Sequence, residues 1–170
     1  PAGGRLPSGG NPYAPNGATR SGEAIDGLIV GHRLMAAGEP ELALKAYYRA
    51  AAEREGVTAD LLSALGSANL ALGRLGQAEQ MLRRALELDQ KFVPAWNNLG
   101  VVLMEKGEIA EASRIFETAF ALDSGQSDSI RENLSLALAK LENPDYDAEE
   151  EEEQFSLVRR GTGEYLLLTK

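Results

Sequence analysis

The 170-residue sequence predicts an all-α fold, namely a solenoid of three helix-turn-helix repeats with a capping helix, followed by a small C-terminal β-hairpin. Three observations support this prediction. Residues 23–142 are rich in Ala, Leu and Glu, and their apolar residues recur three and four positions apart, as in amphipathic helices. Gly-containing turns interrupt the pattern at short intervals. Small residues also recur about every 34 or 35 positions through the same region.

The chain begins with a segment that cannot form part of a core. Residues 1–22 contain four prolines and six glycines, and their only large apolar side chains are Leu6 and Tyr13. Too little apolar surface is available to offset the entropy of ordering, so we expect a disordered Pro/Gly-rich leader. Because the sequence starts at Pro1, we also expect it to be a processed product or an excerpt of a longer gene product.

The periodic region divides into seven expected helices, and Pro40 and Pro94 fall in first turns, where a missing backbone donor is tolerated. The expected helix ranges are 24–37, 40–54, 59–72, 75–88, 94–106, 109–122 and 128–141. The first six form repeats at about 24–58, 59–92 and 93–126. The seventh, without a partner helix, reads as a cap whose polar face meets water.

The repeat has a physical basis in the packing of its two helices. Gly31, Gly66 and Gly100 are 35 and 34 residues apart, and two sets of alanines follow the same spacing. Small residues let paired helices approach closely, while large residues fill the gaps between them. The expected packing residues are Gly31, Ala43, Tyr47, Ala50, Gly66, Ala78, Leu82, Ala85, Trp96, Gly100, Ala112, Phe116 and Ala119. This pattern resembles the tetratricopeptide repeat (TPR), a helix-turn-helix unit of 34 residues.

The TPR resemblance implies a concave face formed by the first helix of each repeat. The residues expected to line it are Leu28, His32, Met35, Ser63, Ser67, Leu70, Asn97, Val101, Met104 and Leu136. None of them is charged, so we expect a helix or an extended peptide of another protein to bind there through apolar contacts. The alternative is a mainly structural face. His32 reads as a polar filler rather than a ligand or a pH switch.

Composition argues against several functions. The net charge of −9 disfavours nucleic acid as a partner. With no cysteine and a single histidine, the chain offers no thiolate or multi-histidine metal site, and we expect no metal, no cofactor and no enzymatic activity. No apolar run approaches the roughly 20 residues of a membrane-spanning helix. Asn133-Leu134-Ser135 spells a glycosylation sequon, but it lies in the expected cap helix.

One function of the TPR family is also disfavoured. TPR co-chaperones hold the acidic tail of heat-shock proteins with Lys, Arg and Asn side chains. The matching positions here are Leu28, His32, Ala64, Pro94 and Asn98. They supply no positive charge to hold a carboxylate.

Two further segments follow the expected cap helix. Residues 143–154 are acidic and read as a solvated linker, or alternatively as a docking site for a basic partner. Residues 155–170 contain two β-prone runs around Gly161-Thr162-Gly163, which predicts a hairpin. A lone hairpin is marginally stable, so it must dock. We expect Phe155, Leu157, Tyr165 and Leu167 to pack back on the array; the alternative is strand addition to a partner's sheet.

A narrower resemblance concerns cellular role. The leader, the absence of cysteine, Asp128–Leu138 (DSIRENLSLAL) and Leu157–Leu168 (LVRRGTGEYLLL) resemble the TPR lipoproteins of bacterial tight-adherence (Tad) pilus assembly. This resemblance implies a non-enzymatic scaffold in the periplasm, anchored at the outer membrane through a lipidated cysteine upstream of Pro1, that assists the secretin or another pilus-assembly component. The alternative is a cytoplasmic TPR adaptor or chaperone that binds a partner peptide in its groove.

Overall fold

A computed structural model describes residues 20–53, 56–144, 155–160 and 164–166. For residues 20–26 and 164–166 only the backbone is described. Residues 145–154 of the expected acidic linker and residues 1–19 of the expected leader therefore lie outside the described residues, as do the hairpin turn at 161–163 and Leu167.

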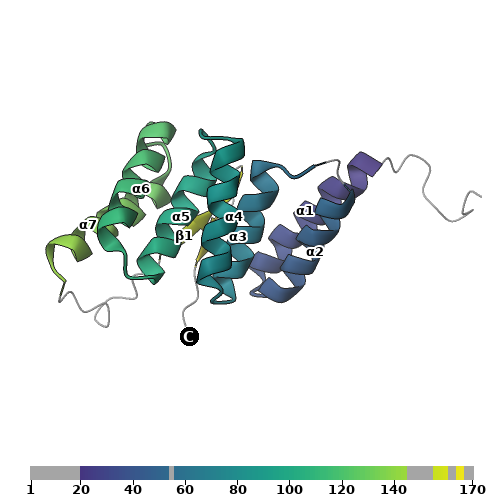
Figure 1. Cartoon of the computed structure of the whole chain (residues 1–170), viewed down its shortest axis with the longest axis horizontal. Helices are drawn as coiled ribbons and strands as arrows, with labels where there is room; N and C mark the ends of the chain where they lie inside the picture. The colour runs from purple at the N-terminus through teal and green to yellow at the C-terminus, as the bar shows by residue number, and fades with distance from the viewer. Residues whose placement is uncertain (1–19, 54–55, 145–154, 161–163, 167–170) are drawn as a thin grey trace, which may run out of the picture.

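The described residues form seven helices, as the sequence predicts (Figure 1). Their bounds are α1 Arg20–Ala36, α2 Pro40–Glu53, α3 Ala59–Ala71, α4 Leu75–Leu88, α5 Val93–Glu105, α6 Ile109–Asp123 and α7 Asp128–Glu142. The largest deviation is at the start of α1, which begins four residues before the predicted position and inside the range expected for the leader. Gly22 lies within this helix. A glycine costs about 1 kcal/mol in a helix interior, which does not by itself end a helix.

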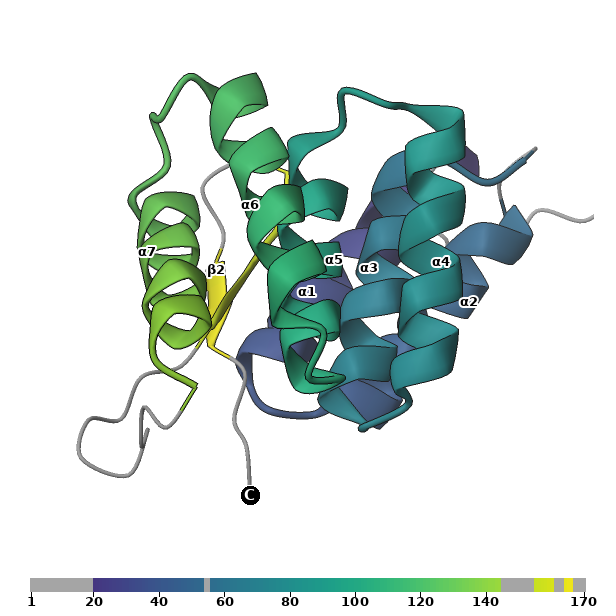
Figure 2. The same cartoon turned by 60° about the vertical axis from the view of Figure 1, so that its left-hand side comes forward.

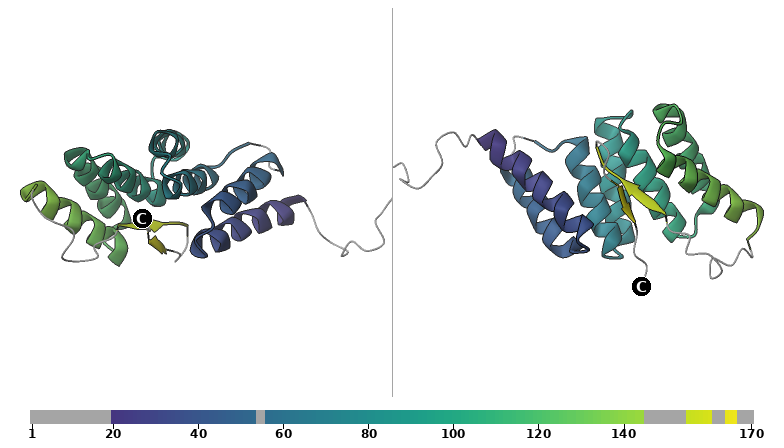
Figure 3. Two further views of the ribbon diagram at one scale, coloured as in Figure 1. Left: turned by 90° about the horizontal axis from the view of Figure 1, so that it is seen from below. Right: turned by 180° about the vertical axis from the view of Figure 1, so that it is seen from behind.

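The helices pack as three antiparallel pairs, α1 with α2, α3 with α4 and α5 with α6, and α7 packs on α6. Successive pairs stack side by side (Figures 1 and 2). The stack bends into an arc, and the two strands lie on its inner side (Figure 3, left). The all-α repeat fold with a cap helix is therefore confirmed.

Close approach within each pair depends on the recurring glycines. A Cβ atom on Gly66 would lie 2.7 Å from Leu82, and one on Gly100 would lie 2.5 Å from the Phe116 ring. A Cβ atom on Gly31 would overlap the Tyr47 ring. All the expected packing residues are buried except Trp96, which is half-buried and donates a hydrogen bond from Nε1 to the Gln90 carbonyl oxygen.

The C-terminal residues form the expected hairpin. Strand β1 is Ser156–Val158 and β2 is Glu164–Leu166. They pair antiparallel, with Ser156 opposite Leu166 and Val158 opposite Glu164. The strand β1 contacts α5 and α7, so the hairpin docks on the helical array of its own chain. Within the described residues, no helix has the length and apolar character needed to span a membrane.

Replacing Gly100 with alanine tests the helix-pair packing. In Gly100→Ala, the new methyl group meets the fully buried Phe116, so we expect the free energy of unfolding to fall by about 1–3 kcal/mol, as overpacking generally costs. Gly76→Ala in α4 is the control, because a Cβ there has no neighbour within 4 Å. That variant should be neutral or up to about 1 kcal/mol more stable. Denaturant unfolding measures both, and equal effects would contradict this packing.

Candidate peptide-binding groove

The residues expected to line the groove come from α1, α3, α5 and α7, but few of them face solvent. Leu28 and Leu136 are half-buried, and the others are buried. Leu70, Val101 and Met104 belong to the hydrophobic core. The inner face of the arc is therefore covered, and β1 is what covers its central part.

Two asparagines hold Ser156 of β1 by its backbone. The Ser156 carbonyl oxygen accepts hydrogen bonds from Nδ2 of Asn97 and from Nδ2 of Asn133, both at 2.9 Å. The Ser156 N–H donates to Oδ1 of Asn133 at 3.0 Å. The Asn133 side chain thus pairs with both backbone groups of one residue.

A third asparagine repeats this arrangement two residues further along the strand. The Val158 N–H donates to Oδ1 of Asn98 at 2.8 Å, and the Val158 carbonyl oxygen accepts from Nδ2 of Asn98, also at 2.8 Å. Residues two apart in a strand present their N–H and C=O groups to the same edge. The asparagine amides therefore take the place of a neighbouring strand along one edge of β1, and β2 pairs along the other.

These asparagines also orient one another. Asn133 donates to Oδ1 of Asn97 at 2.9 Å, and Asn97 donates to Oδ1 of Asn98 at 3.2 Å. Asn98 donates to Ser67 Oγ at 3.0 Å, and that hydroxyl donates to the Ser63 carbonyl oxygen. Each Nδ2 therefore makes two hydrogen bonds, one of them to β1. Because the three side chains are at most 2% exposed, the amide positions are fixed by this buried network.

Apolar side chains anchor the same strand. The Phe155 ring stacks on Phe116 with a centroid distance of 5.8 Å and an interplanar angle of 2°. Lys140 Nζ lies 5.5 Å from the centroid of the Phe155 ring. Leu157, two residues along the chain, is 1% exposed and belongs to the core. Packing of Phe155 and Leu157 on the array is as expected; the side chains of Tyr165 and Leu167 lie outside the described residues.

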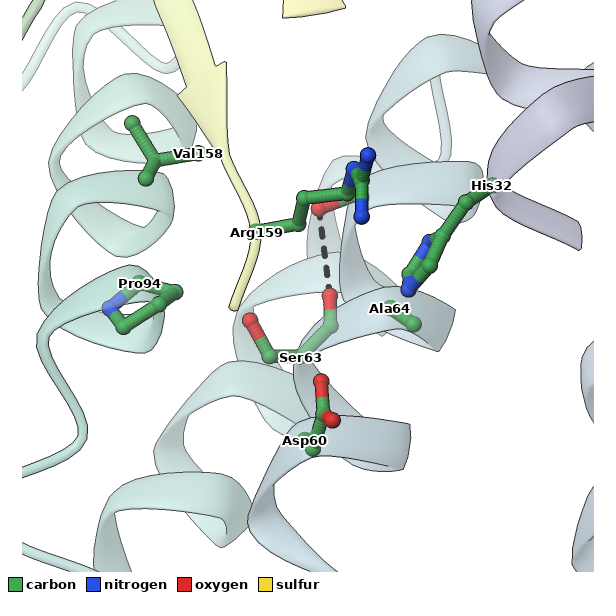
Figure 4. A pocket seen from close by; sticks show the side chains of 8 residues that line it. His32, Asp60, Ser63, Ala64, Pro94, Val158 and Arg159 are labelled. Atoms are coloured by element: carbon green, nitrogen blue, oxygen red, sulfur yellow. Dashed lines mark hydrogen bonds between the residues drawn. The ribbon is translucent and has the colours of Figure 1, made fainter. Parts of the chain in front are cut away.

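A cavity of about 10 Å³ lies at the end of β1 and is lined by Val158 and Arg159, by residues of α1 and α3, and by Pro94 of α5. Figure 4 shows the Arg159 side chain extending to the side of the cavity on which His32 lies. His32 Nδ1 lies 2.8 Å from the Tyr47 hydroxyl oxygen. Burial, and to a smaller extent the positive charge of Arg159, lower the pKa of His32 to about 4. His32 is therefore neutral at neutral pH and joins α1 to α2.

The structure differs from the sequence-based description of the groove in two ways. We expected apolar contacts, rather than charges, to hold an occupant; the strand is held by amide hydrogen bonds as well as by apolar contacts. Asn98 and Asn133 were not among the expected groove residues, although they are 35 positions apart, which is one repeat. Asparagine is disfavoured in helix interiors, so its recurrence at one repeat length was the available signal. Asn133, read as part of a sequon, is buried and hydrogen-bonded.

No catalytic or metal centre is evident in the part of the chain that the structure describes. Among these residues, no three His, Asp or Glu side chains come together as a metal site would require.

Known proteins resemble parts of this chain. Among curated proteins, tetratricopeptide repeat protein 5 of Bos taurus is 38% identical over 65 residues, which are 38% of this chain and 14% of that protein. Cellulose synthase operon protein C of Komagataeibacter xylinus is 36% identical over 77 residues, which are 45% of this chain and 6% of that protein. The chain thus spans only a small part of these relatives.

Solved TPR structures match over more of the chain. The Sgt2 TPR domain from Aspergillus fumigatus superposes with a TM-score of 0.66 at 23% identity and covers 83% of this chain and 91% of that one. The second TPR domain of the human RPAP3 protein, in complex with the HSP70 peptide SGPTIEEVD, gives a TM-score of 0.60 at 26% identity, over 71% of this chain and 98% of that one.

Family models give the same result. Two models described as tetratricopeptide repeat match residues 31–92 and 69–141, and together they span most of the helical array. The repeat spacing, the paired helices and these matches agree, and the chain belongs to the tetratricopeptide repeat family.

Proposed function

We propose that this chain is a non-enzymatic scaffold that binds another protein by holding an extended segment of it on the inner face of the arc. TPR proteins mediate protein–protein interactions, and one structural neighbour is described in complex with a peptide. The main support for the proposal is the set of backbone hydrogen bonds to β1. Asn133 pairs with the N–H and C=O groups of Ser156, and Asn98 pairs with those of Val158.

Backbone pairing of this kind selects a conformation. The amides of Asn98 and Asn133 match N–H and C=O groups two residues apart, which an extended chain presents on one edge and a helix does not. A buried amide left without a hydrogen-bond partner costs about 1–3 kcal/mol. The groove therefore favours an occupant whose backbone forms hydrogen bonds with all of the asparagine amides. The proposed partner segment is therefore extended rather than helical.

The proposed partner differs in charge from the acidic tails of heat-shock proteins. At the positions matching the family's carboxylate clamp, the chain has Leu28, His32, Ala64, Pro94 and Asn98. His32 is neutral, since burial lowers its pKa to about 4. We therefore propose that the groove recognises the partner segment through its backbone and its apolar side chains.

For the cellular role, we propose a periplasmic lipoprotein at the outer membrane that assists the secretin or another component of Tad pilus assembly. The support is the resemblance of Asp128–Leu138 and Leu157–Leu168 to such lipoproteins. The first of these segments contains Asn133 and the second begins within β1, so both take part in the strand contact. The competing proposal is a cytoplasmic adaptor or chaperone, which the peptide complex of the RPAP3 domain favours.

The asparagines provide the test of groove binding. In the organism from which the chain comes, cross-linking with mass spectrometry should identify a partner whose cross-links map to the inner face of α3, α5 and α7. Asn98→Leu combined with Asn133→Leu should reduce capture of that partner at least tenfold, because the backbone groups of the partner segment would be buried without hydrogen bonds.

The matched control combines Arg84→Ala with Arg114→Ala, two exposed side chains outside the groove. Capture by this control should be unchanged, and circular dichroism should show native helicity in both variants. Undiminished capture by the asparagine variant, with cross-links that map outside the inner face of α3, α5 and α7, would rule out the groove as the binding site.

The location of the mature protein tests the pilus proposal. We expect it to fractionate with the outer membrane and to incorporate a fatty-acid analogue, because the proposed anchor is a covalently attached lipid. A protein recovered with cytoplasmic markers, without lipid label, would contradict the pilus proposal and favour the cytoplasmic adaptor.

A further inference from the structure

The groove is occupied by a segment of the same chain, in the manner of a bound peptide. We infer that Phe155–Val158 is a displaceable self-ligand of the groove, and that the partner is a protein with an extended segment carrying an aromatic and an aliphatic side chain two positions apart. This inference rests on the proposed function and specifies both the partner's chemistry and its competition with the tail.

The polar contacts of the strand identify it as a peptide-like occupant. The hydrogen bonds that α5 and α7 make to β1 go to the backbone of Ser156 and Val158. Backbone contacts fix an extended conformation and a register but do not depend on which side chains the strand carries. A second extended chain could satisfy the same amides.

The apolar contacts specify which side chains an occupant needs. Phe155 lies flat on Phe116 and beneath Lys140, and Leu157 is almost fully buried. Ser156 between them is small, and its backbone makes the hydrogen bonds. The groove thus selects an aromatic residue, any small residue and an aliphatic residue in succession.

Burial also explains why the groove is filled. Without an occupant, the amides of Asn97, Asn98 and Asn133 would lose partners, and the Phe116 ring, now 0% exposed, would lose the ring stacked on it. An exposed apolar patch of this kind favours aggregation. A tail that covers the groove until a partner arrives protects the free protein.

Competition with the tail sets a threshold for binding. Residues 143–154 join α7 to the strand, and a short tether of this kind gives an effective concentration on the order of millimolar. A separate segment that makes the same contacts must approach that concentration to displace the tail in half of the molecules, whatever the affinity of the groove for the segment. A physiological partner must therefore make additional contacts or be held nearby.

Cutting the tether in the full chain tests the inference. A cleavage site for a sequence-specific protease replaces Ala148–Glu152, and the probe is a fluorescent synthetic peptide of residues Gln154–Leu166. Fluorescence anisotropy measures its binding before and after cleavage, with the whole helical array and the tail still present. The half-saturating concentration should be near millimolar for the intact chain and at least tenfold lower after cleavage and dilution.

Peptide variants test the side-chain requirement. The Ser156→Ala peptide should bind the cleaved chain as well as the parent peptide does, because only the backbone of that residue is used. The peptide with Phe155→Asp and Leu157→Asp should not bind. Equal binding by this last peptide would overturn the proposed side-chain selection.

Two other outcomes would overturn the self-ligand. If the cleaved tail stays bound and no peptide enters, the tail is a permanent part of the fold. If native mass spectrometry shows the peptide added to a chain that retains its own tail, binding occurs by strand addition. A permanent tail would also withdraw the Asn98 and Asn133 amides from partner binding, so the groove proposal would fall with the self-ligand. Strand addition would overturn the self-ligand and leave the scaffold function to be judged by the cross-linking experiment. Normal exchange without a cross-linked partner would refute the function and not the self-ligand.

Discussion

A strand buried against helices can persist only if both of its edges are paired, because a buried N–H or C=O group without a hydrogen bond costs free energy comparable to a whole interaction. The strand β1 meets this requirement in an unusual way. One edge pairs with β2, and the other pairs with the side-chain amides of Asn97, Asn98 and Asn133. The filled groove, the docked hairpin and the proposed mode of partner recognition all depend on this arrangement.

The helical array makes the amide row possible. Gly100 lets α5 pack directly on Phe116 of α6, and the same Phe116 ring supports Phe155 of the tail. Since α5 and α7 are one repeat apart, Asn98 and Asn133 occupy equivalent places on neighbouring units. Repeat packing thus converts a sequence period of 35 residues into two amides that match alternate residues of a single strand.

The sequence predicted the helices, their close-packing residues and the hairpin because each is set by local periodicity or by spacing within one repeat. It did not predict that the hairpin docks in the groove itself, because Asn98 and Val158 are 60 residues apart and no periodicity links them. Leu70 and Val101 show a related limit: helix phase placed them on the inner face, but burial beneath other side chains depends on the whole assembly.

Nuclear magnetic resonance of the unmodified chain in solution tests the central claim most directly. A docked β1 should give nuclear Overhauser contacts from the Asn98 side-chain amide to Val158 and from the Phe155 ring to Phe116, together with slow exchange of the Ser156 and Val158 amide protons. Random-coil shifts and rapid exchange for residues 155–158, with the asparagine side-chain amides exposed to water, would contradict it.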